Sequence, residues 1–378
     1  MKQIPLSKPS LNYSDLEAFQ RVLDSGWVSA GKYSREFENE FSKVTGIQNC
    51  VAMNSGASAL FVAMKLLHKK KGKIVVPSFT FPATINAVLN AGFEPVISDV
   101  DERTMNITAS KIENVLDNNT IGVVIVHFAG HPCNMDIIFE LTKKYNLSLI
   151  EDCAHALGTY YKGKHVGSWG AGCFSFFASK NITTGEGGML TCIEKSLSDE
   201  ARLLISHGIG PTKSNKDTLP SRTSLIIGHN MRLAGLLGAM GVSQISRLKD
   251  FNEKRKLLAS RYNKAFGKIE NLKVPVSPRF GVHSWHMYVI RLATENLRNW
   301  LFIWLRDRGI EVSIHYRPPL HQQQIYKKYR VKFLDYTSSE KLEKTTLTLP
   351  LFPDLTFREQ DYIIESIIKG LIRWGKNV

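Results

Sequence analysis

Residues 123–152 read VVIVHFAGHPCNMDIIFELTKKYNLSLIED and decide the fold class of this chain. The short apolar runs 123–126 and 147–150 are typical of buried strands. The run between them, 135–145, has the apolar spacing of an amphipathic helix. A strand, a helix and a second strand in this order predict two parallel strands joined by a crossover helix.

The same alternation extends from residue 49 to residue 192. Further strand-like runs are 50–53, 74–76, 95–97 and 173–176, and further helical runs are 57–67, 83–91 and 109–116. Parallel strands are normally buried under crossover helices. The pattern therefore predicts an α/β fold with a mostly parallel central sheet and helices on both faces.

The rest of the chain follows a different pattern. Runs 197–205 and 233–266 look helical, and the second is long enough to bridge two domains. Beyond the proline-containing stretch 274–278, strand-like runs at 286–292 and 310–315 alternate with helical runs at 297–308 and 361–371. We therefore expect an N-terminal arm and a large α/β domain over residues 1–251, and a smaller C-terminal α+β domain over residues 252–378.

The composition is that of a soluble globular protein, with 22% charged and 43% hydrophobic residues in 378. No apolar run reaches the length of about 18 residues that a membrane span needs. The N-terminus is polar and lacks the apolar stretch of a secretory signal. Five scattered cysteines without a CxxC pair indicate reduced thiols, and they give little support to a metal site. We expect a cytoplasmic protein with no membrane contact.

The charge balance is basic, because 49 Lys and Arg residues outnumber 34 Asp and Glu residues to give a net charge of +15. Such a surface can attract nucleic acid, an anionic membrane or an anionic small molecule. The one dense basic cluster, residues 68–73, is interpreted as the solvated end of a helix. No nucleic-acid recognition motif is present, so we favour a small anionic substrate over nucleic acid.

Three short motifs follow predicted strands and carry the chemistry. Asp152 ends one strand, Lys180 follows another strand ahead of the glycine-rich residues 185–188, and Gly56-Ala57-Ser58 opens a helix. Each motif alone has an ordinary interpretation, as a helix cap, a surface lysine or a turn. Together they fit pyridoxal phosphate, which needs a lysine amine, an acid beside its pyridine nitrogen and a phosphate cup.

These segments resemble the DegT/DnrJ/EryC1/StrS family of sugar aminotransferases, which has the aspartate-aminotransferase fold (fold type I of the pyridoxal-phosphate-dependent transferases). The resemblance runs from residues 26–31 to the last helix and is most specific at residues 151–158 and 175–188. It implies a homodimer whose active sites lie at the subunit interface.

The resemblance also assigns individual residues. Lys180 matches the lysine that forms the Schiff base with the cofactor, and Asp152 matches the acid that pairs with the pyridine nitrogen. The remaining matched positions are His155 and Phe81 beside the ring, Gly56, Ala57, Ser58 and Ser175 at the phosphate, Asn230 at the neighbouring subunit's phosphate, and His315 and Tyr316 near the sugar. His229 and Met231 replace the two tyrosines that usually flank the position of Asn230.

The implied activity is transfer of an amino group from L-glutamate to a nucleotide-linked keto sugar, giving a nucleotide-linked amino sugar for polysaccharide or antibiotic biosynthesis. The loop 182–188 most resembles the branch that acts at C4 of a 6-deoxyhexose. The sequence does not identify the nucleotide or the sugar, and it leaves C3 amination open. Two alternatives are a sugar dehydratase of the same family, which carries histidine at the position of Lys180, and a non-catalytic regulatory protein on this fold.

Overall fold

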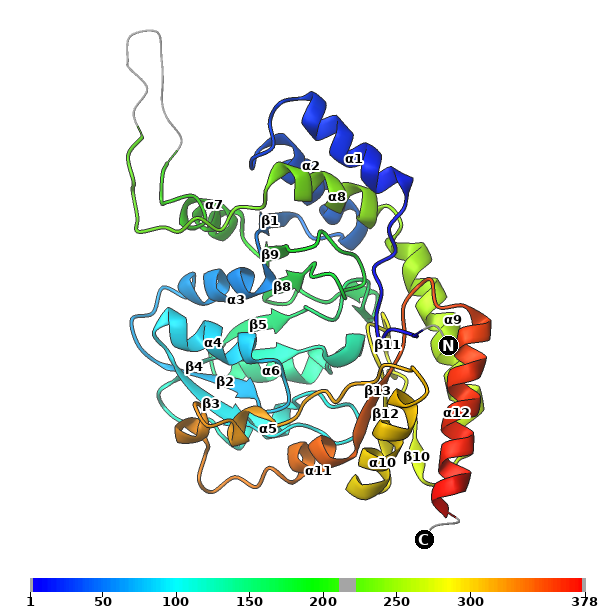
Figure 1. Ribbon diagram of the computed structural model, residues 1–378. Coiled ribbons are helices and arrows are strands. Elements are labelled where there is room, and N and C mark those ends of the chain that lie inside the picture. The colour runs from blue at the N-terminus through cyan, green and yellow to red at the C-terminus, as the bar shows by residue number, and fades with distance from the viewer. Residues whose placement is uncertain (1–2, 211–221, 376–378) are drawn as a thin grey trace, which may run out of the picture.

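The computed structural model describes residues 3–210 and 222–375, and its largest element is a seven-stranded sheet (Figure 1). The strands are β1 (Asn49–Met53), β2 (Lys73–Pro77), β3 (Glu94–Ser98), β4 (Thr120–Val126), β5 (Ser148–Asp152), β8 (Ala171–Ser175) and β9 (Gly188–Cys192). Their order in the sheet is β1-β9-β8-β5-β4-β2-β3. The predicted strands in this region are all present.

The sheet is parallel from β8 to β3, and only β9 runs against both of its neighbours. Val126 pairs with Asp152, and Asp152 pairs with Cys173, so the carboxyl ends of β4, β5 and β8 lie level with one another. This edge is where open α/β sheets bind ligands. The mostly parallel sheet is confirmed. Strand β9 was not predicted, because the glycine-rich residues 185–188 that lead into it resemble a turn.

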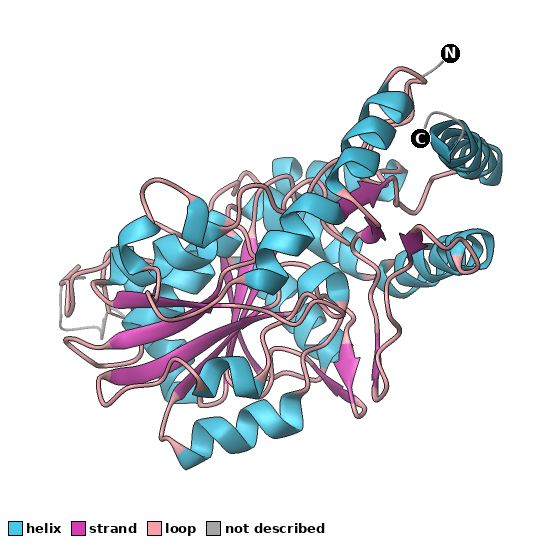
Figure 2. Ribbon diagram, turned by 90° about the horizontal axis from the view of Figure 1, so that it is seen from below, coloured by secondary structure: helices cyan, strands magenta, loops and turns pink. Residues whose placement is uncertain are grey.

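Helices cover both faces of this sheet, as Figure 2 shows. They are α2 (Lys32–Thr45), α3 (Gly56–Lys65), α4 (Pro82–Ala91), α5 (Ala109–Glu113), α6 (Met135–Lys144), α7 (Lys195–Leu204) and α8 (Gly235–Ile245). Apolar side chains of α3, α4 and α7 pack on one face, and those of α5 and α6 pack on the other. Alternate strand residues serve the two cores, since Val76 packs under α4 while Val75 packs under α5 and α6.

A second core lies at the C-terminal end of the chain, around a three-stranded sheet in the order β10-β12-β13. Its elements are α9 (Leu248–Phe266), β10 (Leu272–Lys273), β12 (Tyr288–Leu292), α10 (Glu295–Arg306), α11 (Thr337–Thr345), β13 (Thr346–Leu349) and α12 (Phe357–Gly375). A small sheet of β6 (Tyr160–Tyr161), β7 (Lys164–His165) and β11 (Gly281–Val282) joins it to the large one. The expected domain division at residue 252 falls inside α9 and stays a prediction.

Two expectations for this region were wrong. The run 233–266 is two helices, α8 and α9, separated at Ser246 and Arg247. The break lets α8 pack along α1 (Tyr13–Asp24), where Arg247 pairs with Asp15 at 2.6 Å, while α9 continues toward the C-terminal core. Residues 310–315 form two isolated bridges instead of a continuous strand, because Ile310 pairs with Ile4 of the N-terminal arm while Ser313 pairs with Thr348 of β13.

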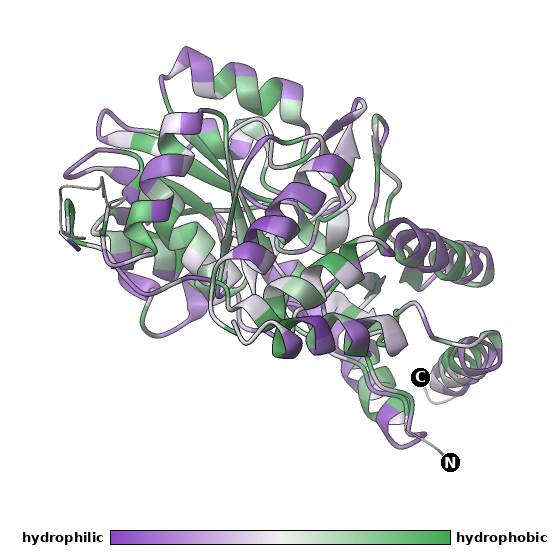
Figure 3. Ribbon diagram, turned by 90° about the horizontal axis from the view of Figure 1, so that it is seen from above, coloured by the Kyte–Doolittle hydropathy of each residue, from purple (hydrophilic) through white to green (hydrophobic). Residues whose placement is uncertain are grey.

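Hydrophobic residues concentrate on the strands and the inward helix faces, as Figure 3 shows by colour. All five cysteines are buried and free. Within the described part of the chain, we find no helix that is both long enough and apolar enough to cross a membrane.

Candidate active site

A cavity of about 580 Å³ lies at the carboxyl edge of the large sheet, a size typical of small-molecule sites. Of the residues predicted from the sequence, it is lined by Gly56, Ala57, Phe81, Asp152, His155, Ser175, Lys180, His315 and Tyr316. Segments separated by more than two hundred residues therefore meet at one place. Ser58 and Asn230 do not line it.

Lys180 enters the cavity from the loop between β8 and β9. Its backbone N–H donates to the carbonyl of Phe177 at 2.9 Å, which fixes a tight turn directly after the strand. Burial lowers the pKa of its amine from 10.5 to about 8, and the nearby Asp152 carboxylate opposes this shift. Near neutral pH a fraction of this amine is therefore unprotonated and nucleophilic.

Asp152 ends β5 and is only 5% exposed. Its carboxylate accepts hydrogen bonds from the Thr84 hydroxyl at 2.8 Å and from the Ala154 N–H at 3.1 Å. Burial raises the pKa of Asp152, against the effect of these two hydrogen bonds and of Lys180. Thr84 lies on the buried side of α4, and the sequence offered no signal for it because a helical threonine resembles other small core residues.

The N-terminus of α3 is a candidate anion-binding cup. Ser55 caps this helix by accepting from the Ser58 N–H at 3.1 Å, which leaves the amides of Gly56 and Ala57 at the cavity wall. A Cβ on Gly56 would come within 2.8 Å of the Cβ of Ser175, so glycine allows α3 to approach β8 closely. Exposed amides at a helix N-terminus suit a phosphate group.

Ser58 contributes to this cup only indirectly. Its hydroxyl donates to the side chain of Asn54 at 2.7 Å, and its N–H is used by the cap. The serine that does line the cavity at this helix is Ser55, which was not among the predicted site residues. An N-cap serine before a glycine is a local signal that could have found it.

Aromatic side chains surround the cavity. His155 is buried, whereas Phe81 is 60% exposed and lies at the rim, with its ring centroid 6.4 Å from that of Tyr316. Burial and Lys180 together lower the pKa of His315 to about 4, and its Nδ1 lies 2.8 Å from the Thr348 hydroxyl. The rim therefore offers rings and neutral imidazoles, which suit contacts to an uncharged ring or to hydroxyl groups.

Other lining residues were not predicted from the sequence. They include Leu6 and Ser7 of the N-terminal arm, Thr80, Phe177, Ser179 and Glu186 of the large sheet's loops, and His286, Met287, Thr348, Leu349 and Leu351 near the C-terminal core. Sequence patterns place the first group on a polar arm and the last on ordinary strands, so neither carries a local signal of a ligand site.

Asn230 lies outside the cavity of its own chain. It is exposed, and its side-chain oxygen accepts from the Arg232 guanidinium at 3.2 Å. The expectation that it reaches the cofactor phosphate of a neighbouring subunit stays a prediction, since one chain is described.

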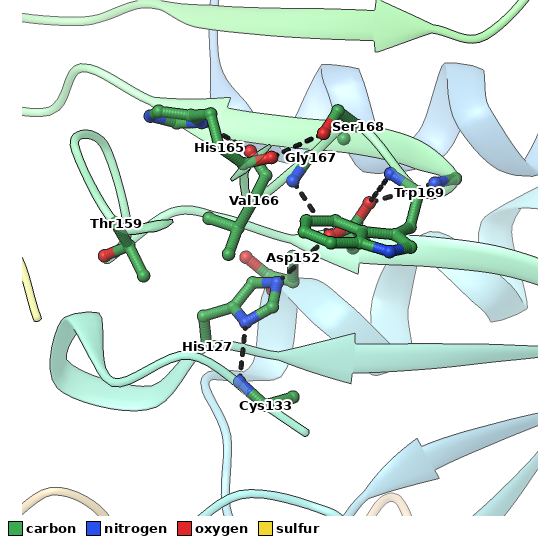
Figure 4. Close-up of polar contacts among 12 residues, drawn as sticks. His127, Cys133, Asp152, Thr159, His165, Val166, Gly167, Ser168 and Trp169 are labelled. Atoms are coloured by element: carbon green, nitrogen blue, oxygen red, sulfur yellow. Dashed lines mark hydrogen bonds and ion pairs between the residues drawn. The ribbon is translucent and has the colours of Figure 1, made fainter. Parts of the chain in front are cut away.

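Glu151 precedes Asp152 and points to the other side of β5. It accepts from the backbone N–H groups of Gly167, Trp169 and Gly170 at 2.8–2.9 Å, and His127 Nε2 lies 3.2 Å away. Figure 4 shows the backbone nitrogens of Gly167 and Trp169 turned toward the strand that carries Asp152, and His127 facing Cys133. The hydrogen bonds to Glu151 tie the loop after β5 back under the sheet and fix the strand end.

His127, Glu151 and Cys153 also form a buried group that could in geometry hold a metal ion. Their lone pairs are in use, because His127 Nδ1 accepts from the Cys133 N–H at 3.1 Å and Glu151 accepts four contacts. Burial raises the pKa of the Cys153 thiol well above its ordinary value, so it stays protonated. We therefore treat the group as structural.

The cavity thus holds a buried amine, a buried carboxyl and a helix N-terminus on its wall. This donor set fits pyridoxal phosphate: Lys180 would hold its aldehyde carbon, Asp152 its pyridine nitrogen and the α3 N-terminus its phosphate. Gly56 and Ala57 at this helix N-terminus line the cavity. Position 56 must be glycine for α3 to lie this close to β8, because a Cβ there would come within 2.8 Å of the Cβ of Ser175.

Known proteins resemble this chain over almost its whole length. The model of the DegT/DnrJ/EryC1/StrS aminotransferase family matches residues 9–368. An aminotransferase from Psychrobacter cryohalolentis is 32% identical over 98% of this chain and 99% of its own, with a TM-score of 0.92. Helicobacter pylori PseC, an aminotransferase of pseudoaminic acid biosynthesis, is 28% identical over 98% and 99%, with a TM-score of 0.91. A Streptococcus pneumoniae protein solved in its PLP-form is 26% identical over 97% and 98%, with a TM-score of 0.90.

Proposed function

Because the chain belongs to the DegT/DnrJ/EryC1/StrS aminotransferase family, we propose that it moves the amino group of L-glutamate to a nucleotide-linked keto sugar with pyridoxal phosphate as cofactor. The favoured acceptor is a 4-keto-6-deoxyhexose, and the product is a nucleotide-linked amino sugar for cell-surface polysaccharide or antibiotic biosynthesis. We place the reaction in the cytoplasm. The observation that supports this most is the shared cavity of Lys180, Asp152 and the α3 N-terminus.

Lys180 is the residue that we expect to transfer the proton between the substrate carbon and the cofactor carbon. When bound, pyridoxal phosphate supplies an electron-withdrawing ring that stabilises negative charge on the substrate carbon. With a pKa of about 8, Lys180 is unprotonated in roughly one molecule in ten at pH 7, and it can take the proton from one carbon and return it to another.

Asp152 and its partners hold the ring in one orientation. The carboxylate is fixed by Thr84 and Ala154, so it presents a defined oxygen to a ring nitrogen. A protonated nitrogen beside it would return Asp152 to its charged form, because an opposite charge offsets the cost of burial. His155, inside the cavity, and Phe81, at the rim, contact the ring from its two sides in this proposal.

The acceptor sugar enters between the rim residues His315, Tyr316 and Phe81. A basic protein surface, at +15 overall, favours arrival of a diphosphate-carrying substrate. We propose a homodimer in which Asn230 of each subunit completes the phosphate cup of the other. Exposed apolar side chains on and just after α1, among them Leu16, Leu23, Trp27 and Val28, provide apolar contact area for the partner.

The runner-up activity is sugar dehydration on the same cofactor. That branch of the family carries histidine where this chain has Lys180, so the lysine favours amino transfer. A regulatory protein would not need the amine, the acid and the cup in one cavity.

The test is an assay of purified protein with glutamate and a panel of nucleotide-linked keto sugars, with products identified by mass. We expect a visible absorption band that borohydride removes, and a product whose mass corresponds to replacement of the keto oxygen by an amino group. Lys180→Ala should abolish both. Full amino transfer by Lys180→Ala, or a deoxygenated product, would contradict the proposal.

A further inference from the structure

His286 is a buried histidine that lines the cavity beside the predicted ring-contacting residue His155. It precedes β12 and therefore comes from the C-terminal core, whereas His155 follows β5 of the large sheet. The two imidazole rings are stacked, with centroids 4.6 Å apart and planes inclined by 28°. His286, from the C-terminal core, thus packs against His155, which belongs to the large sheet.

The backbone of one residue, Ala129, contacts both histidines. Its N–H donates to Nδ1 of His155 at 3.4 Å, and its carbonyl accepts from the backbone N–H of His286 at 2.9 Å. Ala129 has φ +56°, a left-handed conformation that L residues adopt at a cost. Arg255, fully buried in α9, donates to the carbonyl of His286 at 3.2 Å and fixes its other side.

Both rings are uncharged in this environment. Burial, Lys180 and other nearby positive or imidazole groups lower the pKa of His155 and of His286 well below 6.5. Two neutral imidazoles can stack without repulsion, and offset stacking of flat rings is favourable. Nδ1 of His286 has no hydrogen-bond partner among the described residues. His286 therefore contacts His155 through the face of its ring and not through this nitrogen.

We propose that His286 is a positioning residue, which acts by stacking on His155 and thereby sets the plane that His155 presents to the cofactor ring. The inference rests on the proposed function, since it assigns a role toward pyridoxal phosphate. It predicts that a flat side chain of either polarity can serve at position 286, and that a side chain of similar bulk without a flat face cannot.

The test compares His286→Phe with His286→Leu in the holoenzyme. Readouts are the visible circular dichroism of the bound cofactor, which reports the orientation of its ring, and the dissociation constant of pyridoxal phosphate from titration of the apoprotein. We expect His286→Leu to weaken cofactor binding by about two- to twelvefold, the range to which an aromatic stacking free energy converts, and to reduce the dichroism. His286→Phe should restore both to near wild-type values.

His283→Leu is the matched control. His283 lies in the same loop, is equally buried and stacks on Trp285 with centroids 3.9 Å apart, but it does not line the cavity. Urea unfolding of each apoprotein measures the general loss of stability, which we expect for both Leu variants. Only His286→Leu should change the dichroism.

Three outcomes overturn the inference. Wild-type dichroism and affinity in His286→Leu would show that stacking is dispensable, while the proposed function would stand. Equal loss in His286→Phe and His286→Leu would show that the imidazole nitrogens, not the flat face, are required. A wild-type protein without a visible band would remove the proposed function, and this inference with it.

Discussion

Burial moves the acid and the amine of the cavity toward their neutral forms. It raises the pKa of Asp152 and lowers that of Lys180 to about 8. Hydrogen bonds from the Thr84 hydroxyl and the Ala154 N–H stabilise the charged form of Asp152 and offset part of the effect of burial on its pKa. The Lys180 amine has no side-chain hydrogen bond among the described residues, and the Asp152 charge offsets only part of the cost of burying its ammonium form.

Replacing Lys180 should therefore stabilise the cofactor-free protein. Its folded pKa of about 8 lies below the unfolded value of 10.5, so the unfolded chain binds more protons between these pH values and stability rises with pH across this window. At pH 7 the penalty is about 3 kcal/mol, from 2.5 pH units at 1.36 kcal/mol each. Lys180→Met should gain up to this amount in urea unfolding at pH 7.

The gain should shrink toward zero as the pH approaches 10.5. Lys256→Met, on the exposed side of α9, is the control and should change little at either pH. A pH-independent gain in Lys180→Met would contradict the assigned pKa, because it would come from apolar packing alone.

Thr84→Val removes the hydroxyl that hydrogen-bonds to Asp152 and keeps the shape of the side chain. Loss of a hydrogen bond to a charged group costs about 1.5–3 kcal/mol, so we expect kcat/KM for amino transfer to fall roughly ten- to hundredfold. Thr142→Val in α6, where the hydroxyl bonds only to a backbone carbonyl, is the matched control. Equal kinetics in the two variants would exclude a role for Thr84.

At the level of elements, the joint between α3 and β8 fixes the phosphate cup. Gly56→Ala would place a methyl group 2.8 Å from the Cβ of Ser175, so α3 must shift, and we expect a loss of about 1–3 kcal/mol in unfolding free energy. Cofactor affinity should fall as well, because the helix amides move with α3.

A double-mutant cycle checks this cause. Ser175→Gly removes the atom that the new methyl group would meet, so Gly56→Ala should cost less in the Ser175→Gly background than in the wild type. Equal costs in both backgrounds would place the strain elsewhere, for example at the Phe174 carbonyl 3.1 Å away.

At the level of the whole molecule, the proposed dimer divides each active site between two chains. Lys180→Ala subunits mixed with Asn230→Ala subunits should recover activity that neither variant has alone, because a mixed dimer contains one intact site. Random mixing makes half of the dimers mixed, with one of two sites intact, so about one quarter of wild-type activity should return. No recovery after subunit exchange, checked by mass, would exclude a shared site.

Local sequence was sufficient to predict the parallel core, because buried strands and amphipathic helices differ in the period of their apolar residues. It also placed Asp152 at the end of one strand and Lys180 after another, and these strands, β5 and β8, pair in parallel. The antiparallel strand β9 and the break between α8 and α9 depend on contacts with distant segments.

Only the tertiary structure shows which residues surround Lys180 and Asp152 in the cavity. Thr84 lies in helix α4, His286 lies just before strand β12, and Leu6 lies in the N-terminal arm. The local sequence around each carries no signal of a ligand site, and long-range packing brings them to the cavity or to the Asp152 carboxylate. The period of apolar residues indicates whether a segment is buried. Which segments meet at the cavity depends on how the two cores pack against each other. Local motifs therefore predicted several residues that line the cavity, whereas the residues packed around them could not be predicted from the sequence.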